Sequence, residues 1–219
     1  MRISTMPTGT LAGLVGLTLA TPAAASLIVV DWTGDFAIPD IVDPPGVFID
    51  IEVTPDPLGM NEIRDLDVGF MIQSTWQGDL IIAIEHVESG RFHRVLDRPG
   101  APEAGFFGFS ADNYGNLATG EPFILDDEAD NPYDVPFVGS PGIPDVTGRW
   151  QPDTDPLSSF DGDTIIGTWR VWFADQGGGD LAFVRQITLT FDTIPTPGAL
   201  ALLVLAAIRT RRRRQTGTP

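Results

Sequence analysis

The sequence predicts an all-β protein built as a β-sandwich. Segments in which apolar and polar residues alternate are typical of half-buried strands, and Val47–Val53 is the clearest example, with Val47, Ile49, Ile51 and Val53 on one face. Gly- and Pro-rich turns separate such segments, and the central part of the sequence has no helical period of useful length. About ten short strands joined by turns therefore favour a sandwich of two sheets.

The expected strands follow in chain order. Residues 81–84 are apolar on both faces, which predicts a strand in the centre of a sheet. After Gly167, where a sharp turn is expected, Trp169, Val171 and Phe173 share one face, and this alternation assigns Trp169 to the core. We expect a surface loop at 131–148 and strands at 27–30, 47–53, 63–73, 81–84, 92–96, 105–109, 122–125, 168–173 and 181–191.

The two ends of the chain have a different composition from the part between them. Residues 1–25 hold Arg2, an apolar run and a small-residue site that ends at Ala25, which is typical of a secretory signal peptide. Residues 193–219 hold Pro195-Thr196-Pro197, an apolar run at 199–208 and five arginines. The apolar run is shorter than the roughly 20 residues of a spanning helix, so we expect transient membrane association with the arginines on the cytoplasmic side.

Charge separates along the same boundaries. All 30 acidic residues lie between Asp31 and Asp192, whereas Arg2 and five tail arginines account for six of the 13 basic residues. The central part therefore has seven basic and 30 acidic residues, a formal charge of −23. Such a surface excludes nucleic acid and anionic membranes as partners and favours divalent cations. Cysteine is absent, which removes thiol catalysis and thiolate metal sites but does not argue against export.

Several motifs in the central part resemble the P domain of kexin-like and furin-like proprotein convertases. They occur in the family's order: Thr75-Trp76 with Gly78-Asp79-Leu80, then Asp126-Asp127-Glu128-Ala129, then Gly148-Arg149-Trp150-Gln151-Pro152, then Gly167-Thr168-Trp169 with its aromatic strand. The family's histidine before the first motif is Ser74 here. The resemblance implies a jelly-roll sandwich of the galactose-binding-domain-like kind at residues 36–192, after a lead-in strand at 26–35. The subtilisin-like catalytic domain that normally precedes a P domain does not occur in this sequence.

The tail resembles a PEP-CTERM sorting signal, with Thr196 in the place of the family's frequent glutamate. This resemblance implies a bacterial protein that is exported to the cell envelope, the outer surface or the extracellular matrix, with an exosortase-type processing enzyme as a partner. The alternative is a plain C-terminal membrane anchor, whose physical chemistry is the same apart from cleavage.

Two acidic runs are the candidate metal site. Hard oxygen ligands on loops suit calcium, and the resemblance to bacterial P domains also implies calcium. The alternative is a pair of solvated acidic turns. The candidate ligands are Asp126, Asp127, Glu128, Asp161 and Asp163.

Few features of the sequence indicate a catalytic mechanism. A Ser-His-Asp hydrolase needs a histidine beside a serine, but His86 and His93 lie in or beside a hairpin and no Gly-x-Ser-x-Gly motif accompanies them. Exposed tryptophans could instead form a platform for stacking sugars, with Trp76, Trp150 and Trp172 as candidates.

We therefore expect no catalytic residues and a non-catalytic, exported module with a stabilising or binding role and a protein or glycan partner. The alternatives are a carbohydrate-binding surface lectin and a secreted hydrolase or protease accessory protein.

Overall fold

The computed structural model describes residues 25–40, 42–100, 108, 113–133, 145–179 and 181–196. The predicted signal peptide, the apolar and arginine-rich part of the tail, most of the strand expected at 105–109 and most of the loop expected at 131–148 lie outside the described residues. Within these ranges, no helix has the length and apolar character needed to cross a membrane.

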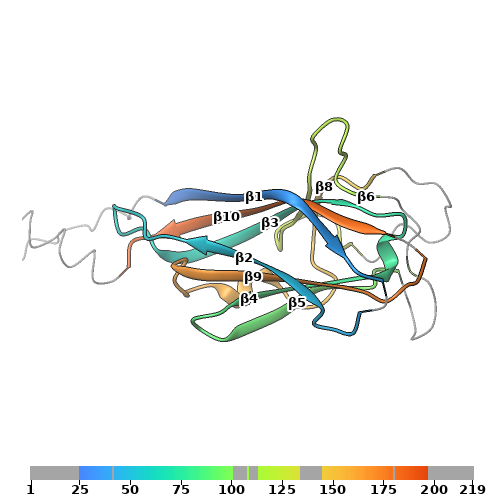
Figure 1. The fold of residues 1–219 in the computed structure, drawn as a ribbon. Coiled ribbons are helices and arrows are strands. Elements are labelled where there is room, and N and C mark those ends of the chain that lie inside the picture. Colours follow the sequence, from blue (N-terminus) through green and yellow to red (C-terminus); the bar gives the residue numbers. More distant parts are fainter. Residues whose placement is uncertain are drawn as a thin grey trace, which may run out of the picture.

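The described chain forms two sheets that pack face to face (Figure 1). One sheet has the order β1-β10-β3-β7-β8, with β6 beside β3, and the other has the order β2-β9-β4-β5. The first sheet comprises β1 (Ser26–Ile38), β3 (Glu62–Gln73), β6 (Asn113–Tyr114), β7 (Phe123–Leu125), β8 (Gly148–Trp150) and β10 (Ala182–Ile194). The second comprises β2 (Val47–Val53), β4 (Leu80–His86), β5 (Arg91–Asp97) and β9 (Gly167–Asp175). The two 3-10 turns are η1 (Gln77–Asp79) and η2 (Leu157–Phe160).

The connections define a jelly roll. Strands β1, β2, β3 and β4 alternate between the two sheets, and β7, β9 and β10 alternate again on the return. The late strands β9 and β10 each insert between early strands, so every long strand pairs with one that is distant in sequence. This is the double-sheet arrangement of two Greek keys. The predicted all-β jelly-roll sandwich is confirmed.

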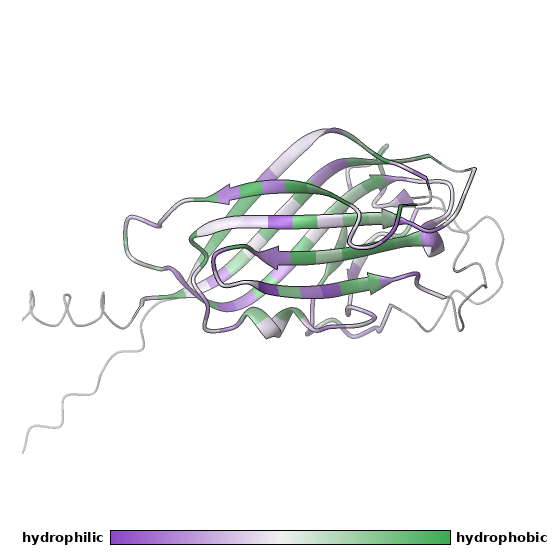
Figure 2. Ribbon diagram, turned by 60° about the horizontal axis from the view of Figure 1, so that its bottom comes forward, coloured by the Kyte–Doolittle hydropathy of each residue, from purple (hydrophilic) through white to green (hydrophobic). Residues whose placement is uncertain are grey.

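The predicted alternation of buried and more exposed residues holds along β2 and through Phe173 of β9. Figure 2 shows apolar and polar residues that follow one another along individual strands. Trp169, Val171 and Phe173 of β9 are fully buried between the sheets, as expected. The prediction for residues 81–84 is also correct, because β4 lies between β9 and β5 and its outer residues Ile81 and Ala83 are buried as well. The core therefore lies between the sheets, and part of the four-stranded sheet is also covered on its outside.

Strand β1 is longer than the sequence suggested. It pairs with β10 from Ser26 to Ile38, with an irregularity between Thr33 and Phe36, and so passes through the boundary that we placed between residues 35 and 36.

The described ends of the chain meet at one end of the sandwich, which we call the terminal pole. Ser26 opens β1 opposite Thr193 near the end of β10, and the turns between β2 and β3 and between β4 and β5 lie at the same end. The opposite end, the distal pole, holds η1 and the connections that follow β1 and β9. Figure 1 shows β1 starting and β10 ending on the left, with η1 on the right.

Candidate binding face

The outer surface of the four-stranded sheet presents a row of aromatic and charged side chains. The register places Phe48 of β2 opposite Trp172 of β9, Trp172 opposite Ala83 of β4, and Ala83 opposite Arg94 of β5. The next row contains Asp50, Arg170, Glu85 and Phe92 in the same strand order. We call this surface, defined by these eight residues, the aromatic face.

Arg170 holds the centre of the aromatic face in place. Its guanidinium donates two parallel hydrogen bonds to Asp50, from Nε to Oδ1 at 2.7 Å and from Nη2 to Oδ2 at 2.9 Å. The same group covers the Phe48 ring, with Cζ 4.0 Å from the ring centroid, and lies 5.4 Å from the Trp172 ring. The hydrogen bonds to Asp50 raise the pKa of Arg170 above its usual range. Such a bidentate, stacked arrangement fixes a geometry that lysine could not reproduce.

Trp172 is fixed from two sides. Its Nε1 donates to Oε2 of Glu85 at 2.9 Å, and its ring lies 4.8 Å from the Phe48 ring at an angle of 59°. The polar edge of the indole is therefore satisfied within the sheet, and its orientation is set before any ligand arrives.

A hollow of about 350 Å³ lies beside this row and is lined by Pro44, Pro45, Ile81, Ala83, Phe92 and Arg94. Ala83 explains its depth, because the residues that flank it in register, Trp172 and Arg94, are much larger. The volume is within the range of small-molecule sites, about 300–1,000 Å³. Phe92 remains 43% exposed and Phe48 42% exposed, so apolar surface is left open to a ligand.

The predicted metal ligands are already engaged by the protein. Asp126 accepts a hydrogen bond from Nη1 of Arg149 at 2.6 Å, and its other oxygen accepts from the backbone N–H of Glu128 at 2.8 Å. Asp127 accepts from the backbone N–H groups of Leu157 and Ser158, at 2.9 and 2.7 Å. Asp127 therefore satisfies the start of η2.

The second acidic run is held separately. Asp163 pairs with Nε of Arg91 at 2.9 Å, while Asp161 is exposed. Partial desolvation raises the pKa of Asp161, with a smaller contribution from the charges of Asp65 and Asp127, and partial desolvation likewise raises the pKa of Glu128. Across the described ranges, no three carboxylate or histidine side chains come together as ligands of one metal ion. Calcium binding therefore stays a prediction.

Arg149 draws two carboxylates together on the outside of the six-stranded sheet. Its Nη2 lies 2.8 Å from Oδ2 of Asp67, and its Nη1 binds Asp126. These two partners raise the pKa of Arg149, whereas burial raises the pKa of Asp67 despite the arginine. Asp67 and Met71 lie on the outer side of β3, and both are buried, Asp67 beside Arg149 of β8.

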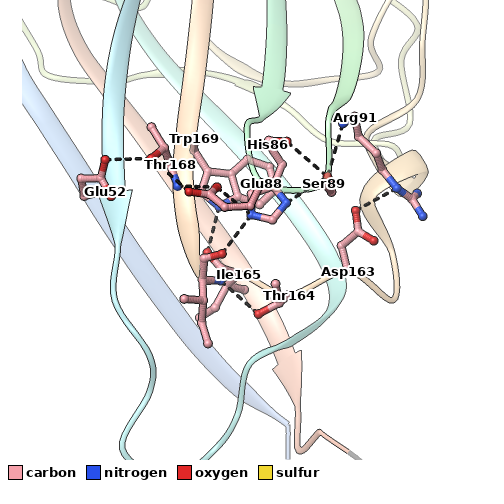
Figure 3. A network of polar contacts seen from close by, with 11 residues as sticks. Glu52, His86, Glu88, Ser89, Arg91, Asp163, Thr164, Ile165, Thr168 and Trp169 are labelled. Carbon is pink, nitrogen blue, oxygen red and sulfur yellow. Dashed lines mark hydrogen bonds and ion pairs between the residues drawn. The ribbon is translucent and has the colours of Figure 1, made fainter.

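His86 lies in a closed network at the terminal pole (Figure 3). Its Nε2 donates to the carbonyl of Ile166 at 3.0 Å, because a carbonyl oxygen can only accept. Its Nδ1 lies 3.0 Å from Oγ of Ser89, and its ring stacks on Trp169 with centroids 4.8 Å apart. Both ring nitrogens are thus engaged, and the histidine joins the β4–β5 hairpin to the segment that enters β9.

Glu88 extends this network across the sheet. It accepts hydrogen bonds from the backbone N–H of Thr168 at 2.8 Å and from its hydroxyl at 3.3 Å, and the first of these lowers the pKa of Glu88. The other histidine, His93, has its ring edge-on to Phe160 at 4.9 Å and its Nδ1 3.8 Å from Asp155. Through these contacts Glu88 and His93 connect neighbouring segments of the fold.

The three tryptophans proposed as a sugar platform do not share a face. Trp76 precedes η1, Trp150 belongs to β8 in the six-stranded sheet and packs against the core, and only Trp172 lies on the aromatic face. Sequence reasoning missed Phe48 and Phe92 as its companions. The signal was present in β2, where Phe48 shares the polar side of the alternation with Asp50 and Glu52.

No family model and no curated protein matches the chain. Among the solved structures that are similar to it at low sequence identity, two contain a serine protease. One contains a serine protease of Aeromonas sobria in complex with the chaperone, with 14% identity and a TM-score of 0.45. The other is of the Aeromonas sobria serine protease, with 13% identity and a TM-score of 0.41. Each match covers 80% of this chain but 28% of the other chain, so this chain spans under a third of the length of those it matches.

Proposed function

We propose that this protein is a non-catalytic, exported binding module of the P-domain-like kind, and that the aromatic face is its binding surface. The observation that carries the proposal is the arrangement of Phe48, Arg170 and Trp172, which are locked together by hydrogen bonds and ring contacts while apolar surface beside them stays exposed. Side chains fixed in advance lose little conformational entropy on binding, which favours affinity.

The position of the hollow supports a displayed module. Pro44 and Pro45 belong to the connection at the distal pole, and Ile81 is the second residue of β4, which starts there, so this side of the hollow lies toward the end opposite Ser26 and Thr193. Phe92, near the start of β5, lines its other side. A chain retained at a bacterial envelope by its tail would carry the binding surface away from the attachment point. Sorting by an exosortase-type enzyme remains part of this proposal and is supported by the layout of the tail sequence alone.

The network at the terminal pole is why we propose no catalytic role. A general base must reach a substrate, yet His86 is buried and uses both ring nitrogens within the protein. His86, together with Ser89 and Glu88, instead connects a hairpin turn to the start of β9.

The test measures retention of the purified full chain on envelope material from the producing cells. Phe48→Ala should reduce retention at least tenfold. The matched control is Phe183→Ala, because Phe183 also lies beneath an arginine, Arg185 at 5.2 Å, but belongs to the six-stranded sheet. Equal retention of the wild type and both variants would refute the assignment of the aromatic face as the binding surface.

A further inference from the structure

Both positive charges on the aromatic face, Arg170 and Arg94, are paired within the protein. Arg170 is neutralised by its bidentate contact with Asp50, and Nη1 of Arg94 lies 2.5 Å from Oδ2 of Asp97. A face built to recognise an anion would need an unpaired positive charge. The surrounding surface, with 30 acidic residues in the central part of the chain, also repels polyanions. The charge arrangement therefore favours an uncharged ligand over an anionic one.

The same face offers both contacts that a sugar ring needs. A pyranose has an apolar C–H surface that stacks on aromatic rings and a rim of hydroxyl groups that donate hydrogen bonds. Phe48, Trp172 and Phe92 supply the rings, and Asp50 and Glu85 place carboxylate oxygens in the row of Phe92, next to the row of Phe48 and Trp172. An apolar surface with a few fixed polar groups is typical of small-molecule sites.

The spacing of the aromatic residues points to a polymer. Phe48 lies on the edge strand β2 and Phe92 on the opposite edge strand β5, with β9 and β4 between them. Neighbouring strands are about 4.8 Å apart, so the two rings are separated by three intervals, or roughly 14 Å across the sheet. That width exceeds a single pyranose ring, and the hollow over Ala83 lies within it.

We propose that the aromatic face binds a neutral polysaccharide, that is, a chain of uncharged pyranose sugars laid across the four-stranded sheet. The proposal rests on the proposed function, because it names the ligand class of the same face. A proline-rich peptide is the rival occupant, since such peptides also dock on aromatic surfaces.

The test is affinity electrophoresis of the full chain in gels that contain dextran, mannan, galactomannan or xyloglucan, with alginate as the anionic comparison. We expect retardation by at least one neutral polymer and none by alginate. Phe48→Ala and Phe92→Ala should each weaken that interaction at least tenfold, and Phe183→Ala should change it less than twofold. Circular dichroism of each variant checks that a loss of binding is not a loss of folding.

The outcomes separate the two proposals. Retardation by alginate equal to that by a neutral polymer overturns the neutral-sugar assignment, and so does the absence of any retardation while the protein still binds envelope material through Phe48. In that second case periodate, which cleaves sugar diols, would leave envelope binding intact, whereas protease treatment of the envelope material would abolish it. Absence of any Phe48-dependent retention refutes the proposed function itself.

Discussion

Substitution of Trp169 by alanine tests the assignment of the core most directly. The side chain is fully buried, and its ring contacts Phe160 and Phe191, each with a centroid distance of 5.1 Å, as well as His86. Burial of 150–250 Å² by an aromatic side chain contributes about 4–6 kcal/mol at 25 cal/mol per Å². The indole also donates from Nε1 to the carbonyl of Ile165 at 2.9 Å, and alanine would leave that carbonyl without this donor.

We therefore expect Trp169→Ala to lower the free energy of unfolding by about 4 kcal/mol, which lies in the range measured for such changes. For a domain of this size that loss lowers the Tm by roughly 8–16 °C. Urea unfolding followed by tryptophan fluorescence and circular dichroism gives the free energy. Trp172→Ala is the control, because this residue lies on the same strand but on the outer face and should cost less than half as much. Equal losses for the two variants, or a loss below 1 kcal/mol for Trp169→Ala, would refute the facing of β9.

Three further predictions follow. Gly46→Ala should destabilise the protein far more than Gly90→Ala. Both glycines have positive φ (92° and 69°), but of the two only Gly46 has a backbone atom, the Phe173 oxygen, in the way of an added Cβ, at 1.9 Å. Similar urea midpoints for the two variants would contradict this prediction. Partial burial and the charge of Asp67 raise the pKa of Asp65 in the folded state, so the folded protein binds the proton more tightly than the unfolded chain does. The contribution of Asp65 to stability should therefore increase as the pH falls from neutral through its folded-state pKa toward its ordinary range. The difference in Tm between the wild type and Asp65→Asn should change over this interval, and a constant difference would argue otherwise. If the acidic turns at 126–128 and 161–163 bind calcium, calcium at a hundredfold excess over its Kd should stabilise the folded state by about 2.7 kcal/mol. Identical Tm values in calcium and in chelator would contradict calcium binding at these turns.

The fold could be predicted because its strongest signals are local. Alternation in β2, β3 and β9 identified the inner faces, and the continuous apolar run in β4 identified a central strand. The order of strands within each sheet has no such signal. Pairing of β10 with both β1 and β3 depends on contacts between distant segments, and periodicity says nothing about which strands are neighbours.

The candidate site could be predicted only in part, for the same reason. Trp172 was singled out as an aromatic residue on the outer side of its strand, but its companions come from β2 and β5. The acidic runs were conspicuous in the sequence, yet Asp126 binds Arg149, Asp127 binds the backbone of η2, and Asp163 binds Arg91. A single sequence shows how many carboxylates are present but not how many of them the fold has already neutralised.

The fold covers the apolar groups on the outside of the four-stranded sheet to different degrees. Ile81 and Ala83 point outward but are buried by larger neighbours, so they have already contributed their hydrophobic free energy to folding. Phe48 and Phe92 lie on edge strands, where one side lacks a neighbouring strand, and each keeps about two fifths of its surface exposed. A ligand can still bury this exposed apolar surface. Their truncation should therefore reduce binding much more than it reduces stability, which is the reverse of what we expect for Trp169.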